Sequence, residues 1–256
     1  MGAKTLYKYL DAEGGSSMLE KSNLQFTNAT RLNDPFDCHP SLIDFSKIPA
    51  EKAKMWGKEL SIELDAQYFR HQRDEAWICS LSKIHNSILM WSYYSNHKGV
   101  CIGIDMEKTE KYIKNLHCQL WIGAHEMEVQ YLDVIDKPDF YQNFGGRDLY
   151  SYQLCTKAKA WEHEQEVRLL LMDPCYGWIP SRPEPGHEKD EVIDYKLFRF
   201  YPHIGPECFE SLYLGIKMEE KERENIIQVA KRVNPDIKIY QMKVDPDAFR
   251  LIEEQI

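Results

Sequence analysis

The chain has 256 residues, of which 43% are hydrophobic and 29% are charged, and its formal net charge is −9. These proportions are ordinary for a folded globular protein and exclude a chain that is disordered over most of its length. The acidic balance disfavours charge-driven binding to nucleic acid or to anionic membranes. We therefore expect a single soluble mixed α/β domain over residues 1–256.

The default location is the cytoplasm. The first ten residues lack the apolar core of a secretory signal, and no apolar run approaches the roughly 18 residues that a membrane-spanning helix needs. The seven cysteines are odd in number and contain no Cys-x-x-Cys, which is typical of reduced thiols. The histidines show no His-Glu-x-x-His spacing, so we predict no metal site.

The first half of the chain alternates short strands and helices. Gly14 and Gly15 break the chain before the first helix, Pro35 bars a helix at Asp34, and Asp105 caps a later helix. In chain order the patterns predict a strand over 5–10, a helix over 16–22, a strand over 24–27, a loop over 31–37, a helix over 49–73, a strand over 76–80, a helix over 87–95, a strand over 100–104 and a helix over 105–116.

The second half continues in the same manner. The patterns predict a strand over 127–131, a largely helical segment over 140–159, a strand over 165–172, a proline-rich loop over 174–185, strands over 192–200 and 211–214, a helix over 219–233 and a strand over 237–242. Strands and helices are thus interspersed along the chain, which indicates a mixed α/β domain.

The richest polar cluster runs from Trp161 to Arg168, at the entry to an otherwise apolar strand. Because strand side chains alternate, Glu164, Glu166 and Arg168 are expected on one face. A close carboxylate pair suits acid/base work or stabilisation of a developing cation. Arg168 could neutralise the pair or bind a phosphate. The same pattern also fits a solvated strand face with weak ion pairs, and the residues alone leave both readings open.

A second cluster, over residues 90–99, ends a predicted helix and enters a strand. His97 could act as a base or donate to a ligand, and Trp91 and Tyr94 could offer a flat stacking surface. The alternative is a helix C-terminus closed by Gly99, with its aromatic residues in the core. The familiar signatures of nucleotide-binding loops and of the hydrolase nucleophile elbow are missing from the sequence.

Several short motifs, taken together, resemble a bacterial family known only as domain of unknown function 2971. They span most of residues 5–172, and the family name carries no activity. The motifs are Leu6-Tyr7-Lys8-Tyr9, Asn33-Asp34-Pro35-Phe36-Asp37, Cys79-Ser80-Leu81-Ser82, Met90-Trp91-Ser92-Tyr93-Tyr94, His97-Lys98-Gly99-Val100-Cys101 and Trp161 through Arg168.

A more distant likeness is to the ADP-ribosyltransferase fold. Ser80-Leu81-Ser82 is similar to the serine element of a middle strand in that superfamily, and Glu164-Gln165-Glu166 is similar to its late Glu-x-Glu. The likeness implies a single α+β domain with a mixed, mostly antiparallel split β-sandwich core flanked by helices. It also implies a cleft that binds NAD as the substrate.

The likeness assigns roles to individual residues. Glu166 would face the oxocarbenium charge that develops on the ribose, and Glu164 would orient or deprotonate the acceptor. The early motif has neither the Arg nor the His of the superfamily, so Lys8 or Arg31 would replace that group at the pyrophosphate. The other residues expected around NAD are Tyr9, Asn33, Ser80, Ser82, Trp91, His97 and Arg168.

The expected function is therefore an NAD-dependent ADP-ribosyltransferase-like activity on an unknown macromolecular acceptor, in a toxin or phage-defence effector. A non-catalytic module that senses a nucleotide or binds a protein is the alternative. A third reading is a nuclease or other hydrolase in which Glu164 and Glu166 hold a divalent ion.

Overall fold

The computed structural model describes residues 4–47, 74, 76–120, 124–141, 147–172 and 199–256. The predicted helix over 49–73, the proline-rich loop over 174–185 and most of the strand over 192–200 lie outside the described residues. Within the described ranges, no helix combines the length and the apolar character needed to cross a bilayer.

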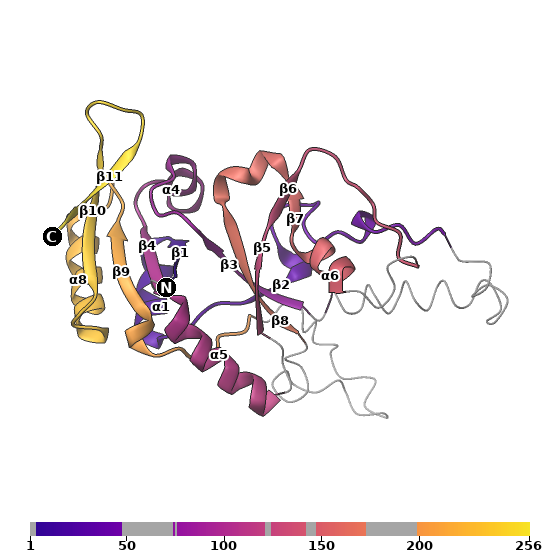
Figure 1. Cartoon of the computed structure of the whole chain (residues 1–256). Coiled ribbons are helices and arrows are strands. Elements are labelled where there is room, and N and C mark those ends of the chain that lie inside the picture. Colours follow the sequence, from indigo (N-terminus) through magenta and orange to yellow (C-terminus); the bar gives the residue numbers. More distant parts are fainter. Residues whose placement is uncertain (1–3, 48–73, 75, 121–123, 142–146, 173–198) are drawn as a thin grey trace, which may run out of the picture.

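A nine-stranded sheet forms the centre of the protein (Figure 1). Its order is β11-β10-β9-β4-β1-β3-β8-β5, with β2 paired to β3, and β9 and β10 are parallel while the other pairs are antiparallel. A mixed α+β fold with a mostly antiparallel sheet is thus confirmed. The strands are β1 (Thr5–Leu10), β2 (Thr27–Asn28), β3 (Ala76–Ser82), β4 (Val100–Asp105), β5 (Ala124–Glu128), β8 (Glu166–Met172), β9 (Phe209–Leu214), β10 (Lys238–Val244) and β11 (Leu251–Gln255). A separate parallel pair contains β6 (Gln130–Leu132) and β7 (Thr156–Ala158).

The sheet comes close to dividing between β1 and β3. β1 pairs with β4 along its whole length, and β3 pairs with β8 along its whole length. By contrast, β1 and β3 are in register at one position alone, where Tyr7 lies opposite Ser82. The sheet therefore consists of two half-sheets, β11-β10-β9-β4-β1 and β3-β8-β5 with β2 paired to β3, which are joined at this point.

Helices cover both faces of the sheet. Among the described residues the helices are α1 (Ala12–Lys21), α4 (Ile88–Ser95), α5 (Met106–Leu120), α6 (Arg147–Leu154) and α8 (Glu220–Val233), and the 3₁₀ turns are η1 (Ala29–Arg31), η2 (Pro40–Leu42), η3 (Lys159–Glu164) and η5 (Pro206–Cys208). Buried residues of α1, α5 and α8 share one core cluster with Leu6 and Ile102 of the sheet. The intervening residues Tyr9 and Cys101 pack with Trp91 of α4. Strand alternation therefore puts α4 on the opposite face.

The first helix begins earlier than predicted, at Ala12 rather than at residue 16. Asp11 caps it, since the Gly14 N–H donates to the Asp11 carboxylate at 2.7 Å. Gly15 lies inside this helix, where a Cβ would come within 2.3 Å of Val100 Cγ2. Gly15 therefore permits close packing on β4, and the Gly-Gly pair does not break the chain.

Three further boundaries differ from the prediction. The segment expected to be helical over 140–159 contains the shorter α6, followed by β7. The strand expected over 24–27 is reduced to β2 and an isolated bridge between Phe26 and Phe200. β11 was missed because its sequence Leu-Ile-Glu-Glu-Gln is mostly polar, as suits an exposed strand at the edge of a sheet.

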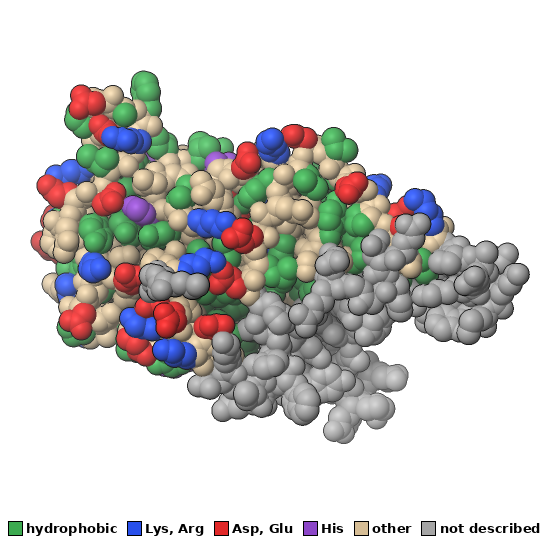
Figure 2. All heavy atoms as spheres, in the orientation of Figure 1, with side chains coloured by type: hydrophobic (Ala, Val, Ile, Leu, Met, Phe, Trp, Pro, Cys, Tyr) green, Lys and Arg blue, Asp and Glu red, His purple; other side chains and the backbone are tan. Residues whose placement is uncertain are grey.

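Acidic and basic side chains are mixed on the face of the molecule seen in Figure 2, and hydrophobic side chains are scattered among them. The hairpin between β10 and β11 projects from one end and carries the fully exposed Phe249. The face drawn in Figure 2 therefore carries no extended patch that is only acidic or only basic.

Gly99, between α4 and β4, provides a test of this packing. A Cβ at Gly99 would lie 2.1 Å from the backbone oxygen of Leu10, so Gly99→Ala must displace the main chain of β1. We expect a loss of about 1–3 kcal/mol in the free energy of unfolding, measured in urea. Gly14→Ala is the matched control, because its Cβ would lie 2.9 Å from a side-chain oxygen of Asp11 and not against the main chain, in a helix that favours alanine. Equal losses in the two variants would contradict the packing argument.

Candidate functional site

A small pocket opens where the two half-sheets join. It has a volume of about 40 Å³, which is room for a few waters or for one end of a larger ligand. Tyr94 at the pocket is 40% exposed, so this wall reaches the protein surface. The lining residues are Tyr7, Lys8 and Tyr9 of β1, Ser80, Leu81 and Ser82 of β3, Met90 and Tyr94 of α4, and Glu164 and Glu166.

The backbone brings the two glutamates to one wall in an unexpected way. Glu164 ends η3, Gln165 adopts a left-handed conformation with φ 43°, and Glu166 is the first residue of β8. The prediction that a continuous strand aligns the two carboxylates is therefore wrong, although both do line the pocket. The strand register places Ser82 opposite Glu166, and the Ser82 hydroxyl donates to the Glu164 carbonyl at 2.7 Å.

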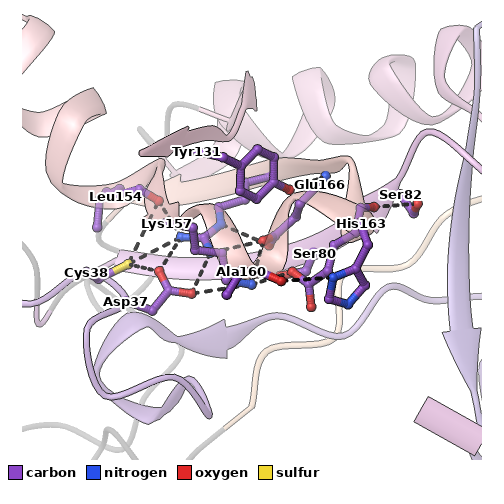
Figure 3. Close-up of polar contacts among 12 residues, drawn as sticks. Asp37, Cys38, Ser80, Ser82, Tyr131, Leu154, Lys157, Ala160, His163 and Glu166 are labelled. Carbon is purple, nitrogen blue, oxygen red and sulfur yellow. Dashed lines mark hydrogen bonds and ion pairs between the residues drawn. The ribbon is translucent and has the colours of Figure 1, made fainter. Parts of the chain in front are cut away.

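Behind this wall lies a buried network of charged side chains, of which Figure 3 labels Asp37, Lys157 and Glu166. It contains three carboxylates and two cations, whose exposures run from 0% for Arg168 to 7% for Asp37 and Lys157. The members are Asp37 in the loop before η2, Lys157 in β7, Glu164 at the end of η3, and Glu166 and Arg168 in β8. Carboxylates thus exceed cations by one within the network.

Arg168 is the largest member of the network and is enclosed by protein acceptors. Its guanidinium binds Asp37 through two hydrogen bonds of 2.8 and 2.6 Å and Glu166 through two of 2.9 and 3.1 Å. A further N–H donates to the Leu154 carbonyl at 2.5 Å. Arg168 is not among the residues that line the pocket, so it can act on a ligand only by fixing Glu166.

Lys157 joins the two glutamates. Its ammonium donates to Glu164 Oε2 at 2.5 Å and to Glu166 Oε2 at 3.0 Å, and Asp37 Oδ2 lies at 3.8 Å. The ring of Trp161 lies 5.2 Å from the same nitrogen, within cation–π range. The lysine therefore occupies the place between the carboxylates that a bound cation would take.

These contacts set the charge of the site. Burial alone would raise the pKa of Glu166, but Arg168 and Lys157 outweigh it and lower that pKa from 4.5 to about 2. Burial opposes the charge on Lys157, yet Glu166 and Glu164 raise the pKa of Lys157. Burial, and then Glu164, raise the pKa of Tyr94, whose hydroxyl donates to Glu164 at 2.8 Å. At neutral pH the pocket thus presents an ionised Glu166 beside a protonated phenol.

The other predicted site residues fall into two groups. Lys8, Tyr9 and Ser80 line the pocket, and Lys8 donates to the Ser80 carbonyl at 2.8 Å. Trp91 is fully buried and donates to the His85 carbonyl at 2.8 Å, so it is a core residue with no free ring face. Neither His97 nor the exposed Arg31 and Asn33 are among the residues that line the pocket.

Sequence reasoning missed Asp37, Lys157 and Tyr131 as site residues. The backbone N–H of Glu166 donates to the Tyr131 hydroxyl at 2.7 Å, and burial raises the pKa of that phenol to about 12. Asp37 belongs to the motif over 33–37, whose turn-forming residues predict a loop and no site. Lys157 lay in a segment predicted to be helical, and no local pattern pointed toward the glutamates.

Across the described ranges, no three His, Cys, Asp or Glu side chains come together in a way that could hold a metal ion. The acids of the network are held apart by Lys157 and Arg168. The described residues therefore do not fit a divalent-ion hydrolase at this wall.

The fold and site define an α+β protein with an ionised carboxylate pocket at the junction of two half-sheets. A family model described as "Protein of unknown function (DUF2971)" matches residues 90–169. The matched segment contains Tyr94, Lys157, Glu164, Glu166 and Arg168, whereas the motifs over 6–9, 33–37 and 79–82 lie outside it. Neither the curated proteins nor the solved structures contain a match to this chain.

Removal of the central cation should destabilise the protein. Arg168→Met leaves Asp37 and Glu166 buried without their main partner, so we expect a loss of about 3–5 kcal/mol in the free energy of unfolding, measured in urea. The same substitution at Arg223, which pairs with the exposed Glu220 on α8, should change stability by less than about 0.5 kcal/mol. A small effect at both positions would refute a structural role for the network.

The low pKa of Glu166 predicts a dependence of stability on pH. A carboxyl whose pKa is lower in the folded state stabilises the fold above its unfolded pKa, and that contribution is lost as the pH falls through the folded value. The loss should therefore develop between pH 4.5 and about 2. In urea titrations over this window, Glu166→Gln should show a shallower decline than the parent. Parallel curves would contradict the assignment.

Proposed function

We propose that the protein cleaves NAD at the nicotinamide glycosidic bond and transfers ADP-ribose to a macromolecular acceptor. The observation that carries the proposal is the ionised Glu166 at the wall of a pocket between two half-sheets, directly opposite Ser82 in the strand register. A carboxylate held charged in a buried wall suits the stabilisation of a cationic transition state.

We propose an ADP-ribosyltransferase-like split β-sandwich for this sheet, because β1 and β3 are in register at one position alone. That fold has a split β-sandwich core and a nicotinamide dinucleotide cleft, with a serine element on a middle strand and a Glu-x-Glu on a late strand. Here Ser80 and Ser82 on β3 and Glu164 and Glu166 next to them line the pocket at the near-division of the sheet. The order of these elements along the chain agrees with the likeness.

The proposed reaction is a displacement at C1′ of the nicotinamide ribose. The bond from C1′ to the ring nitrogen breaks and its electron pair leaves with neutral nicotinamide, while an acceptor oxygen forms the new bond to C1′. Glu166 stabilises the positive charge that develops on the ribose, and Glu164 accepts the proton of the acceptor. Arg168 and Lys157 keep Glu166 ionised for this purpose.

Among the described residues that line the pocket, Lys8 is the one basic side chain. We therefore propose that its ammonium binds the pyrophosphate of NAD. The Lys8 ammonium donates to the Ser80 carbonyl at 2.8 Å, and because an ammonium has three protons, others are left for phosphate oxygens. The pocket of about 40 Å³ would hold only the ribose end of the substrate. The remainder of NAD would extend over the adjoining surface.

A second candidate is a non-catalytic module that senses a nucleotide or binds a protein. Both oxygens of Glu166 already accept hydrogen bonds from Arg168, and both oxygens of Glu164 accept from Tyr94 and Lys157. Carboxylates whose oxygens all accept hydrogen bonds from the protein are held rigidly. Such carboxylates fit a pocket that only binds a ligand as well as a pocket that catalyses a reaction.

The test is release of nicotinamide from NAD by the parent and by Glu166→Gln. Because substitution at Glu166 also disturbs the buried network, Asp37→Asn is the matched control: Asp37 contacts the same Arg168 and Lys157 but does not line the pocket. At a temperature where all three proteins are folded, we expect kcat to fall about 10²–10³-fold in Glu166→Gln and less than about tenfold in Asp37→Asn.

The outcomes separate the two candidates. Release by the parent with a selective loss in Glu166→Gln supports the transferase. If NAD raises the melting temperature of the parent and no nicotinamide is released, the binding module is favoured. Equal activity in the parent and in Glu166→Gln would overturn the catalytic role of Glu166.

A further inference from the structure

Helix α4 is apolar on both of its sides. Met90 and Trp91 face the core, where they share a buried cluster with Leu251 of β11. The other side of the helix carries neither an acidic nor a basic residue, and its large side chains are Ile88, Leu89 and Tyr93, which are 41%, 45% and 64% exposed. A helix that is apolar all round is normally enclosed, and exposed apolar side chains that lie together mark interaction surfaces.

The hairpin between β10 and β11 stands next to this helix. Leu251 of β11 packs with Trp91 of α4, and the ring of His85, just before the helix, lies 3.4 Å from the carboxylate of Glu253. Figure 1 shows α4 and the hairpin at the same end of the molecule. The hairpin adds two exposed apolar side chains, Val244 and Phe249. We call these two side chains and the exposed side of α4 the apolar end surface.

The apolar end surface adjoins the mouth of the pocket. Tyr94 follows Tyr93 on α4, is itself partly exposed and lines the pocket, where its hydroxyl donates to Glu164 at 2.8 Å. The rings of Tyr93 and His163 lie 5.7 Å apart, so the surface continues to the η3 turn that ends at Glu164. Whatever covers the exposed side of α4 therefore lies beside the opening of the pocket.

We propose that the apolar end surface is the docking site of a protein partner, which in the proposed reaction is the acceptor of ADP-ribose. The inference rests on the proposed function for the role of the partner. It adds that the macromolecular acceptor is a protein, and that its contact surface places apolar side chains around the oxygen nucleophile. Docking at α4 brings that oxygen to the side of the pocket where Glu164 and Tyr94 lie.

The chemistry of the surface favours a protein over nucleic acid or a membrane. Nucleic acid is bound by Lys and Arg side chains that neutralise phosphates, and α4 has neither. An anionic membrane also requires basic side chains beside the apolar anchors, whereas the hairpin tip over 245–250 carries two aspartates for one arginine. Uncharged aromatic and aliphatic side chains are typical of the centre of a protein interface.

The position of the surface favours an acceptor over a second copy of this chain. A lasting dimer through α4 would cover the exposed side of Tyr94 and close the pocket to its ligand. An acceptor must instead approach the pocket, react and leave. Contact beside the mouth of the pocket meets this requirement.

The experiment separates transfer from cleavage of NAD. Transfer of labelled ADP-ribose to proteins of a whole-cell extract is compared with nicotinamide release in buffer, where water is the acceptor. In Tyr93→Ser and in Phe249→Ser, transfer should fall about ten- to thirtyfold, while release in buffer stays within about twofold of the parent. Tyr201→Ser is the matched control, because Tyr201 is 48% exposed and lies in the segment that leads into η5 and β9 at the other end of the sheet (Figure 1).

Each outcome decides the proposal. Loss of transfer in Tyr93→Ser and Phe249→Ser, with release unchanged and Tyr201→Ser like the parent, supports it. Equal transfer in the parent and in both variants overturns it, as does an equal loss in Tyr201→Ser. Label that is removed by nuclease and not by protease would overturn the assignment to a protein.

A second readout requires no NAD. A photo-reactive benzophenone side chain is placed at Leu89, or at Tyr201 as the control, and the protein is illuminated in the same extract. Position 89 should give a protein adduct that disappears when Phe249→Ser is added, and position 201 should give none. No adduct at position 89, an adduct of two copies of this chain, or an adduct that nuclease removes would overturn the proposal.

A membrane is tested with vesicles of phosphatidylethanolamine and phosphatidylglycerol. The parent should remain in solution when these vesicles are sedimented. Sedimentation of the parent with the vesicles that is lost in Phe249→Ser would assign the apolar end surface to a membrane and overturn the proposal.

The two proposals fail in different ways. If the parent releases no nicotinamide but position 89 gives the expected adduct, the NAD reaction is wrong and the docking site stands. If ADP-ribose is transferred equally by the parent and by both surface variants, the NAD reaction stands and the docking site is overturned.

Discussion

The structure depends on the compensation of charge around Arg168, which is fully buried. A buried guanidinium is tolerated only where its donors meet good acceptors, and here those acceptors come from three separate segments. Asp37 lies in a loop, Glu166 begins β8 and the Leu154 carbonyl ends α6. One side chain therefore fixes the loop, the helix and the strand against each other, and in doing so it orients the carboxylate that faces the pocket.

The same strands build both the core and the site, because their side chains alternate. On β3 and β8, Cys79 and Val167 face the main hydrophobic cluster, while Ser80 and Glu166 face the pocket. A slip of one residue in the register would send the Glu166 carboxylate into the core. The apolar face of these strands therefore fixes the geometry of the polar face, and the near-division between β1 and β3 leaves the space that the pocket occupies.

The pattern of apolar residues along the chain correctly predicted the central strands of the sheet. The strand over 5–10 coincides with β1, and the strands over 100–104 and 211–214 fall within β4 and β9, because these runs are apolar and β-branched or aromatic. The sequence predicted that Glu164 and Glu166 lie together, but for the wrong reason. The left-handed conformation of Gln165, and not strand alternation, places Glu164 at the pocket. Asp37 could not be predicted as a partner, because it contacts a residue 131 positions away and only the tertiary fold brings the two together.

The network itself argues that this wall has a function beyond stability. Burying five ionisable side chains costs desolvation energy, and well-packed apolar residues of similar volume are often as stabilising as a buried ion pair, or more so. A protein that needed only a packed core at β8 could place aliphatic residues there, as it does at Leu169 and Leu171 on the opposite face. The charged residues are instead concentrated behind the pocket, and the pKa of Glu166 is lowered to about 2 at its wall. Strongly shifted groups of this kind gather at functional sites. The energetic cost of the network is therefore best understood as the means by which the fold holds an ionised carboxylate at a pocket that a ligand can reach.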